Sequence, residues 1–418
     1  MIRRVTLLTT GQPSTNPRLV KEADALASAG FDVSVIGIRR AGWADASDTG
    51  LLAGRAWRAR LLDPGRTRFG IARVASALRH RLARMAGARS NDAWLAAALS
   101  PVAPLLFGAA RHTRADLYIA HNLGALPAAA ASAAATGAKL GFDAEDFHSG
   151  QLSGDSPELE VTRLAEARFI PACDYVTAAS HGIAARYAPL RTEPPAVVLN
   201  VFPRAERPQA PELPAAGGPF RLYWFSQTIG PDRGLEDAVA AMGLLPEFHI
   251  ELHLRGEWQP GYESSLRERA VRAGVPADRV VGLPPAPAAE MVRLSAPFHA
   301  GLALEDGRTV NRDIALTNKL FTYLLAGVPV AASATTAQQW FCDQAGAAAR
   351  AYAPGQPAAL ASLLRSWLAA PDTLVAARRA AWALGERRFN WDLEQRAFLA
   401  VIDRVLGVPG TRRTELAS

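Results

Sequence analysis

Lysine is rare in this chain, and one lysine stands where a phosphate could be bound. The sequence has 46 Lys and Arg residues, but only Lys21, Lys139 and Lys319 are lysines. Lys319 lies in the segment 317–330, which predicts the start of a helix, its end and the next strand. A compact ammonium group beside the positive end of a helix is suited to binding phosphate. The alternative interpretation is a solvated lysine at a helix end.

A second cation occupies a similar position earlier in the chain. The run 224–236 leaves a predicted strand, turns and enters a predicted helix, with Arg233 at the turn. Open α/β sheets bind ligands at this end of their strands. We therefore expect Arg233 and Lys319 to meet over a diphosphate and to stabilise its charge as it departs. For Arg233 alone, a surface arginine in a turn is the alternative.

The hydrophobic pattern predicts two α/β domains in tandem. A strand at 5–8, a helix capped by Asn16 and a strand at 31–38 form a unit with a right-handed crossover. The other predicted strands are 116–120, 139–142, 175–178, 196–199, 221–226, 250–254, 280–281, 300–304 and 328–332. The predicted organisation is a first domain over 1–202, a proline-rich linker over 203–219, a second domain over 220–385, and a C-terminal helical segment over 386–418 that packs back on the first domain.

Composition and patterning indicate an ordinary folded protein in a reducing compartment. Hydrophobic residues make up 49% and charged residues 20% of the chain. Cys173 and Cys342 match no metal or redox spacing, so they are predicted to be small core residues. The uncharged run 93–110 is rich in alanine and contains two prolines, which favours a buried or interfacial segment over a membrane span. No signal peptide is expected, and the predicted location is cytoplasmic.

The net charge of +7 is concentrated in one stretch. Between Arg55 and Arg89, ten arginines accompany one acid, Asp63, and apolar residues are interleaved with them. Such a stretch suits an anionic membrane surface, which would place the protein peripherally on the inner face of the membrane, or a phosphorylated acceptor. A solvated arginine-rich face is the alternative. No nucleic-acid partner is expected, because no recognition motif or aromatic stacking pattern accompanies the charge.

The first strand–helix loop argues against a nicotinamide or flavin enzyme. It contains one glycine, Gly11, where a dinucleotide-binding fold needs three. The second strand ends at residues 37–40, which include no acid to hold a ribose.

The motifs, in this order, resemble family 4 of the retaining glycosyltransferases, which have the GT-B fold. The segment 318–329 looks like the donor-site helix of that family, and 233–236 looks like its lysine–glycine turn. Segments 16–23, 120–122 and 142–147 also fit the family pattern. The resemblance implies an α/β protein of two Rossmann-like, doubly wound parallel-sheet domains that face an interdomain cleft.

The same resemblance implies a reaction. A sugar would pass from a nucleoside-diphosphate sugar, with UDP or GDP favoured, to a glycan, lipid-linked or small-molecule acceptor, with retention of the anomeric configuration, as in polysaccharide biosynthesis. The donor would bind mainly to the C-terminal domain and the acceptor to the N-terminal domain. Neither a metal ion nor a further cofactor is expected.

The resemblance also implies roles for individual residues. His121 would lie near the donor sugar and Glu305 near the donor hydroxyls, and these two are the predicted catalytic residues; a capping or core histidine is the alternative for His121. The implied diphosphate contacts are Arg233, Lys319 and Asn318, and the implied acceptor-side residues are Gly11, Asp143, Glu145 and His148. The residues after 142 could equally cap the next helix.

The chain departs from the family pattern at the nucleotide. Thr322 stands where a ribose-binding glutamate is usual, and Ser226–Gln227 replaces a Gly–Arg pair, which removes one phosphate cation. Thr322 and Gln227 remain the predicted nucleotide and ribose contacts, and the reduced loop at Gly11 indicates an unusual acceptor. Two alternatives stay open. One is a catalytically silent, sugar-nucleotide-binding partner of a glycan assembly complex. The other is a metal-dependent transferase that uses the acidic residues of 143–146.

Overall fold

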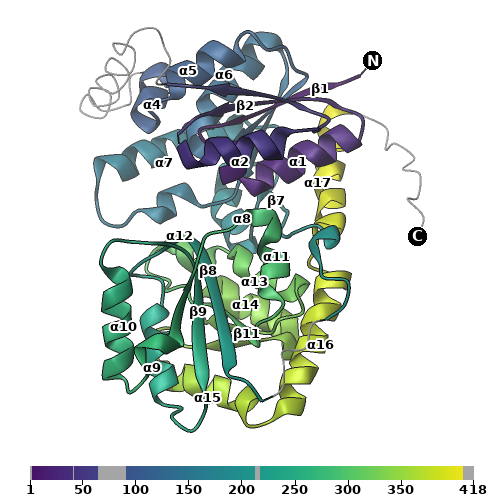
Figure 1. Cartoon of the computed structure of the whole chain (residues 1–418). Coiled ribbons are helices and arrows are strands. Elements are labelled where there is room, and N and C mark those ends of the chain that lie inside the picture. The colour runs from purple at the N-terminus through teal and green to yellow at the C-terminus, as the bar shows by residue number, and fades with distance from the viewer. Residues whose placement is uncertain (1, 41, 65–90, 212–216, 408–418) are drawn as a thin grey trace. The chain divides into compact units, whose positions relative to one another are not determined.

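The computed structural model describes residues 2–40, 42–64, 91–211 and 217–407, which belong to two compact units (Figure 1). The first unit comprises 1–198 and 395–418, and the second comprises 199–394. The chain therefore passes between the units at Val198–Leu199, a few residues before the expected linker, and again within helix α17 (Trp391–Leu406). Most of the arginine-rich stretch, residues 65–90, lies outside the described residues.

The first unit is built on a parallel sheet of seven strands in the order β3-β2-β1-β4-β5-β6-β7. Its strands are β1 (Arg4–Thr9), β2 (Asp32–Ile38), β3 (Arg58–Leu62), β4 (Leu117–His121), β5 (Lys139–Ala144), β6 (Tyr175–Ala178) and β7 (Ala196–Val197). Its helices are α1 (Pro17–Ser28), α2 (Gly42–Leu52), α4 (Asp92–Leu99), α5 (Ala103–Ala110), α6 (Leu126–Thr136), α7 (Pro157–Phe169) and α8 (His181–Tyr187). Helix α1 begins as predicted, because the Asn16 side chain accepts a hydrogen bond from the Leu19 amide at 3.0 Å.

The second unit is built on a parallel sheet of six strands in the order β10-β9-β8-β11-β12-β13. Its strands are β8 (Phe220–Ile229), β9 (Ile250–Trp258), β10 (Val280–Leu283), β11 (Ala300–Ala303), β12 (Val330–Ser333) and β13 (Ala349–Tyr352). Its helices are α9 (Leu235–Gly243), α10 (Tyr262–Arg272), α11 (Met291–Ser295), α12 (Val310–Ile314), α13 (Asn318–Leu325), α14 (Thr336–Ala345), α15 (Pro357–Leu368) and α16 (Pro371–Arg387). Helices lie on both sides of this sheet (Figure 1).

Each sheet contains a point where the strand order reverses. In the first unit this point lies between β1 and β4, and in the second unit it lies between β8 and β11. Loops that follow neighbouring strands leave to opposite faces at such a point and open a crevice beyond the strand ends, where α/β proteins bind their ligands. The reversal in the second unit places the segment after Ile229 beside the segment after Ala303. Of the two predicted cations, Arg233 follows β8 and Lys319 follows β11.

The predicted fold is confirmed, and every strand expected from the sequence is present. The structure adds β3 and β13, which the sequence reading missed. Both strands contain arginine or alanine in place of the β-branched residues that signal a strand. The uncharged run 93–110 forms α4 and α5. Among the described residues, no helix is long and apolar enough to cross a membrane.

Candidate functional site

In the second unit, the turn before α9 is pressed against the end of β11. Gly234 has a φ of +68°, and a Cβ atom there would lie 2.7 Å from both the Cβ and the carbonyl oxygen of Leu304. Only glycine combines this conformation with so close an approach. The contact holds Arg233, directly before the glycine, near Glu305, directly after Leu304. The turn and the strand end therefore form one wall of the candidate site.

Lys319 extends into the same place from the first turn of α13. The residue is only 7% exposed. Its Nζ atom lies 3.4 Å from Oε1 of Glu305 and 3.3 Å from Oγ1 of Thr317. The ammonium group also lies 5.2 Å from the centroid of the Trp224 ring, within the range of a cation–π interaction. Residues from β8, from the end of β11 and from the start of α13 thus fix the position of this charge.

Lys319 lies near other cations, and their charges shift its pKa. Burial lowers the pKa of Lys319, and the positive charges of Arg233 and Arg312 lower it further, while Glu305 raises it. The net direction is down, so burial and the neighbouring arginines outweigh the carboxylate. A polyanion would reverse this balance, because it would attract all three cations together.

The two helices that begin at this site lack side-chain caps. The N-cap residue of α9 is Gly234, which has no side chain. The N-cap residue of α13 is Thr317, whose side chain accepts no hydrogen bond from the first turn. The Thr317 hydroxyl accepts from Lys319 instead. By contrast, Asn16 and Ser180 cap α1 and α8 with their side chains. The N-cap side chains therefore leave the first-turn amides of α9 and α13 to an anion, which the helix dipole also favours, except that the Leu320 amide of α13 donates to the Thr317 carbonyl oxygen at 3.2 Å.

The residues predicted to hold the nucleotide differ in exposure. Gln227 is exposed near the end of β8, in the part of the strand where its register with β9 is irregular. Thr322 is fully buried, and its hydroxyl donates to the carbonyl oxygen of Asn318 at 3.0 Å. This burial argues against a ribose contact by Thr322. Asn318, the first residue of α13, is partly exposed beside Lys319.

In the first unit, His121 ends β4 and is fully buried. Its Nε2 atom lies 3.2 Å from Oε2 of Glu22, and its Nδ1 atom lies 3.3 Å from Oδ2 of Asp143 and 3.8 Å from Oε1 of Glu145. Burial by itself lowers the pKa of His121, but Glu22, Asp143 and Glu145 together raise it well above its ordinary value. The histidine therefore has carboxyl groups on both sides, an arrangement that favours its protonated form. This burial argues against direct contact between His121 and a sugar.

Arg18 completes a buried ring of charged side chains with Glu22, His121 and Asp143, which we call the charge ring. Arg18 donates from Nε and Nη2 to the two oxygens of Asp143 at 2.6 and 2.7 Å, and from Nη1 to the carbonyl oxygen of Val198 at 2.6 Å. Burial alone would raise the pKa of Asp143, but Arg18 and His121 hold it well below its usual range. Asp143 therefore links β5 to α1, and its burial argues against the predicted acceptor contact.

The charge ring is poorly suited to a metal ion. Oxygen and nitrogen atoms of Glu22, His121 and Asp143 lie within 4.8 Å of one another, which is close enough to share a cation. However, Arg18 already donates to both oxygens of Asp143, and the raised pKa of His121 disfavours the neutral imidazole that a metal ion needs. With Asp143 directed into the core, the acidic residues of 143–146 do not converge on an exposed ion. The metal-dependent alternative thus loses its central ligand.

Three predicted acceptor-side residues reach, or lie near, the surface at the ends of β1 and β5. The Glu145 side chain is 28% exposed. The amide of Leu123 donates to Nε2 of His148 at 3.2 Å, and burial lowers the pKa of His148, so this imidazole is neutral. Gly11 is partly exposed, and its carbonyl oxygen accepts from the amide of Ile38 at 2.8 Å. Glu145 is therefore an acidic side chain that lies next to the charge ring and reaches solvent.

The loop after β4 is strained next to these residues. Asn122 has a φ of 69°, a conformation that favours glycine. Its side chain is held at the ends of the neighbouring strand, where it accepts from Oγ1 of Thr10 at 3.1 Å and donates to Oγ1 of Thr9 at 3.2 Å. Strain of this kind is common at functional sites. Asn122 lies where the strand order of the first sheet reverses.

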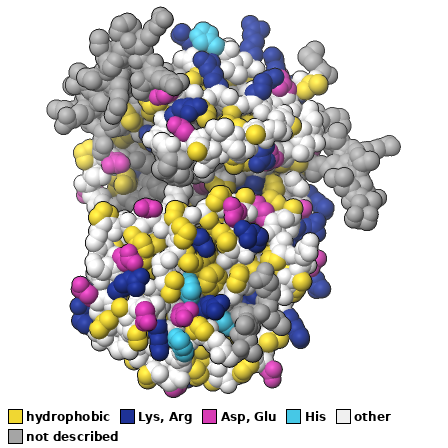
Figure 2. All heavy atoms as spheres, in the orientation of Figure 1, with side chains coloured by type: hydrophobic (Ala, Val, Ile, Leu, Met, Phe, Trp, Pro, Cys, Tyr) yellow, Lys and Arg dark blue, Asp and Glu magenta, His cyan; other side chains and the backbone are white. Residues whose placement is uncertain are grey.

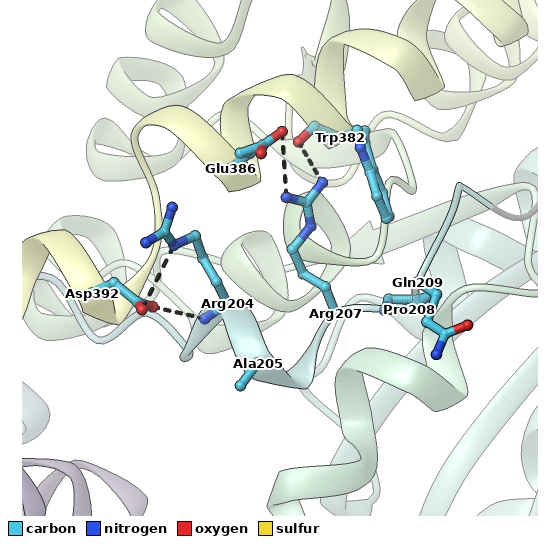
Figure 3. A pocket seen from close by; sticks show the side chains of 8 residues that line it. All are labelled: Arg204, Ala205, Arg207, Pro208, Gln209, Trp382, Glu386 and Asp392. Carbon is cyan, nitrogen blue, oxygen red and sulfur yellow. Dashed lines mark hydrogen bonds and ion pairs between the residues drawn. The ribbon is translucent and has the colours of Figure 1, made fainter. Parts of the chain in front are cut away.

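A separate pocket of about 610 Å³ lies in the second unit (Figure 3), and its lining includes neither Arg233 nor Lys319. Its lining residues are Arg204, Ala205, Arg207, Pro208, Gln209, Trp382, Glu386 and Asp392. The Arg207 guanidinium stacks 3.7 Å from the centroid of the Trp382 ring, and Trp382 in turn covers Gly327, just beyond the C-terminal end of α13. Lys319 is at the other end of that helix. The pocket therefore belongs to the attachment of segment 204–209 to α16.

Comparisons with known proteins agree with this architecture. No family model matches the chain, and no curated protein matches its sequence. Solved structures do match. HepE of Anabaena in complex with UDP-glucose has a TM-score of 0.71 at 15% identity, over 96% of this chain and 100% of that one. Sucrose-phosphate synthase from Thermosynechococcus elongatus has a TM-score of 0.71 at 14% identity, over 97% and 100%. The lipopolysaccharide outer core galactosyltransferase WaaB has a TM-score of 0.62 at 12% identity, over 96% and 99%. These likenesses show that the fold is GT-B.

Proposed function

We propose that this chain is a glycosyltransferase of the retaining type. It moves a sugar from a nucleoside-diphosphate sugar to the hydroxyl of a glycan, a lipid-linked glycan or a small molecule. The donor binds to the second unit and the acceptor to the first. We also propose that the protein acts in polysaccharide biosynthesis and is located in the cytoplasm.

One observation carries the proposal. Lys319 is nearly buried, next to Glu305, at the reversal point of the second sheet, with Arg233 and two helix N-termini that lack side-chain caps. Burial disfavours the charged form of Lys319, and perturbed pKa values of this kind cluster at functional sites. Negative charge that develops on a departing diphosphate supplies one, because preorganised cations stabilise it without rearranging at the moment of reaction.

Glu305 has a distinct part in this proposal. Its side chain is 16% exposed, and Oε1 faces Lys319. Lys319 thus holds the carboxylate in one orientation, from which it accepts hydrogen bonds from hydroxyl groups of the donor sugar. The diphosphate and the sugar are in this way positioned by two adjoining side chains. Such positioning is a major part of the rate enhancement in transfer reactions.

The fold neighbours support a uridine nucleotide as the first donor to test. HepE has been crystallised with UDP, with UDP and glucose, and with UDP-glucose. We propose a UDP or GDP donor, of which only UDP has support from these neighbours. A panel of UDP, GDP, ADP and the corresponding sugars should reveal the base by thermal stabilisation, because a ligand that binds the folded state raises its apparent stability.

The assignment is tested by removing each cation in turn. Lys319→Ala and Arg233→Ala should lower turnover by about two to three orders of magnitude while the fold is kept. Lys139→Ala is the matched control, because Lys139 is half exposed in a surface pair with Asp174. Near-normal turnover in both site variants would remove the proposed donor site.

A second candidate function is a silent partner that binds a sugar nucleotide within a glycan assembly complex. The buried hydroxyl of Thr322 and the exposed Gln227 favour it, because both stand where the family has residues that grip the nucleotide. Calorimetry combined with a donor hydrolysis assay separates the two functions. Binding without hydrolysis or transfer would favour the silent partner.

We further propose peripheral binding to an anionic membrane through the arginine-rich stretch. Within its described part, Arg55 and Arg58 pair with Asp24 and Asp32 of the first unit. On the face of the second unit in view, acidic and basic side chains are interspersed with hydrophobic ones (Figure 2). Binding to anionic liposomes should weaken as salt is added, and the absence of binding at low salt would refute this location.

A further inference from the structure

The loop between β11 and α13 carries two arginines that the family pattern does not require. Arg308 and Arg312 both pair with Asp306 in this loop, and Arg308 also pairs with Asp232. Arg312 belongs to the short helix α12, whose first turn is capped by the Thr309 hydroxyl. The two arginines differ in burial, since the Arg308 side chain is 66% exposed and that of Arg312 is 31% exposed.

Arg312 connects the turn before α9 to the segment after β11, which together form one wall of the candidate site. Its Nη1 atom donates to the carbonyl oxygen of Asp232 at 2.9 Å and to the two carboxylate oxygens of Asp306 at 3.1 and 3.2 Å. Asp232 directly precedes Arg233, and Asp306 directly follows Glu305. The positive charge of Arg312 is also one of the charges that act on Lys319. Arg308 is not among the charges that shift the pKa of Lys319.

We propose that Arg312 is a third diphosphate-binding residue, which supplies the positive charge that is missing at Gln227. In the empty protein, Asp306 holds the guanidinium in place, and a bound diphosphate takes over that contact. This inference rests on the proposed donor site and adds to it a residue that the family pattern does not predict.

The chemistry of the guanidinium suits this role. All the hydrogen bonds that the Arg312 side chain makes to described residues use Nη1, so Nη2 and Nε can donate to a phosphate. Arg233, Arg312 and Lys319 together outnumber the two acids, of which Glu305 pairs with Lys319 and Asp306 with Arg312. A site with this excess of positive charge favours a diphosphate over a monophosphate or an uncharged nucleoside. Selectivity for the second phosphate is therefore the property to measure.

The test compares two variants with opposite expected effects. Arg312→Gln should weaken binding of the best nucleoside diphosphate among UDP, GDP and ADP by about tenfold or more, because a hydrogen bond to a charged group is lost. Binding of the matching monophosphate should change less than about threefold. Asp306→Asn should strengthen diphosphate binding, because it removes the carboxylate that competes for Arg312. If the ion pair were only structural, both substitutions would weaken binding.

Arg308→Gln is the matched control, since it removes an arginine of the same loop that pairs with the same acid. It should leave diphosphate affinity within about threefold of the parent protein. The inference is overturned if Arg312→Gln behaves like Arg308→Gln, or if Asp306→Asn weakens binding as well. Should none of the three nucleotides bind the parent protein, the proposed donor site fails, and this inference fails with it. Loss of binding in Lys319→Ala alone would uphold the donor site and refute the role of Arg312.

Discussion

Replacing Lys319 by methionine should separate stability from function. Methionine is unbranched and of similar length, so it fills the space that the lysine stem occupies. We expect the empty protein to keep its stability or to gain some, and to lose most of its affinity for a nucleoside diphosphate. A lysine that served only to hold the fold together would give the opposite result for stability.

The magnitude follows from the surroundings of the ammonium group. Burial and the charges of Arg233 and Arg312 lower the pKa of Lys319 against the effect of Glu305. Each unit of lowering corresponds to about 1.4 kcal/mol of unfavourable free energy for the charged form in the folded state. Methionine removes this term but leaves Glu305 without its ion pair, although Arg233 and Arg312 still stand nearby. The two effects oppose each other, so we expect a change within about 1 kcal/mol, or roughly 2–4 °C in Tm.

The loss of binding should be much larger. A hydrogen bond from a charged group to phosphate contributes about 1.5–3 kcal/mol, which corresponds to roughly 10- to 150-fold in affinity. Thermal unfolding with and without UDP and GDP, together with calorimetric titration, measures both quantities. Lys139→Met is the control and should alter neither, because its pair with Asp174 is at the surface. A fall in Tm of about 10 °C or more for Lys319→Met in the empty protein would refute the reasoning.

Two more predictions concern charge. Because the pKa of Lys319 is lowered, the ammonium loses its proton as pH rises through a value below the ordinary 10.5, and diphosphate binding should weaken over that range. A measurement of Kd against pH should show this weakening. Arg233→Ala removes a charge that lowers the pKa of Lys319, so the weakening should occur at higher pH in that variant. A Kd that stays constant up to pH 10.5 would contradict it. In the first unit, Arg18→Met removes the bidentate partner of the buried Asp143 carboxylate, which keeps His121 and the Thr177 hydroxyl as neighbours, and should cost about 3–5 kcal/mol in urea unfolding, whereas a change below about 1 kcal/mol would show that the charge ring adds little.

The fold was predictable because its signals are local. Alternating strand and helix patterns, an Asn–Pro helix start and a proline-rich break identify two parallel-sheet units. The missed strands, β3 and β13, are edge strands. Edge strands bury less of their surface, so their sequences carry a weaker hydrophobic pattern. Arg58 and Arg350 lie in these strands.

The candidate site was predictable only in part, because burial depends on the tertiary structure. The motif order identified Lys319 and Arg233, and the structure brings both to one strand-order reversal. The sequence could not show that Asp143 points into the core, since its partner Arg18 is distant in the chain. It also gave no reason to choose Arg312 from the many arginines. The spacing of Arg18 and Glu22, four apart beside the apolar residues of α1, was a signal that could have been used.

The missing caps at α9 and α13 have a consequence for the thermodynamics of binding. Backbone amides that no side chain satisfies must be hydrated while the site is empty. A diphosphate that takes their place releases this ordered water to bulk solvent. Part of the affinity should therefore be entropic in origin, and well-ordered water molecules should mark the positions of the phosphate oxygens before any donor arrives.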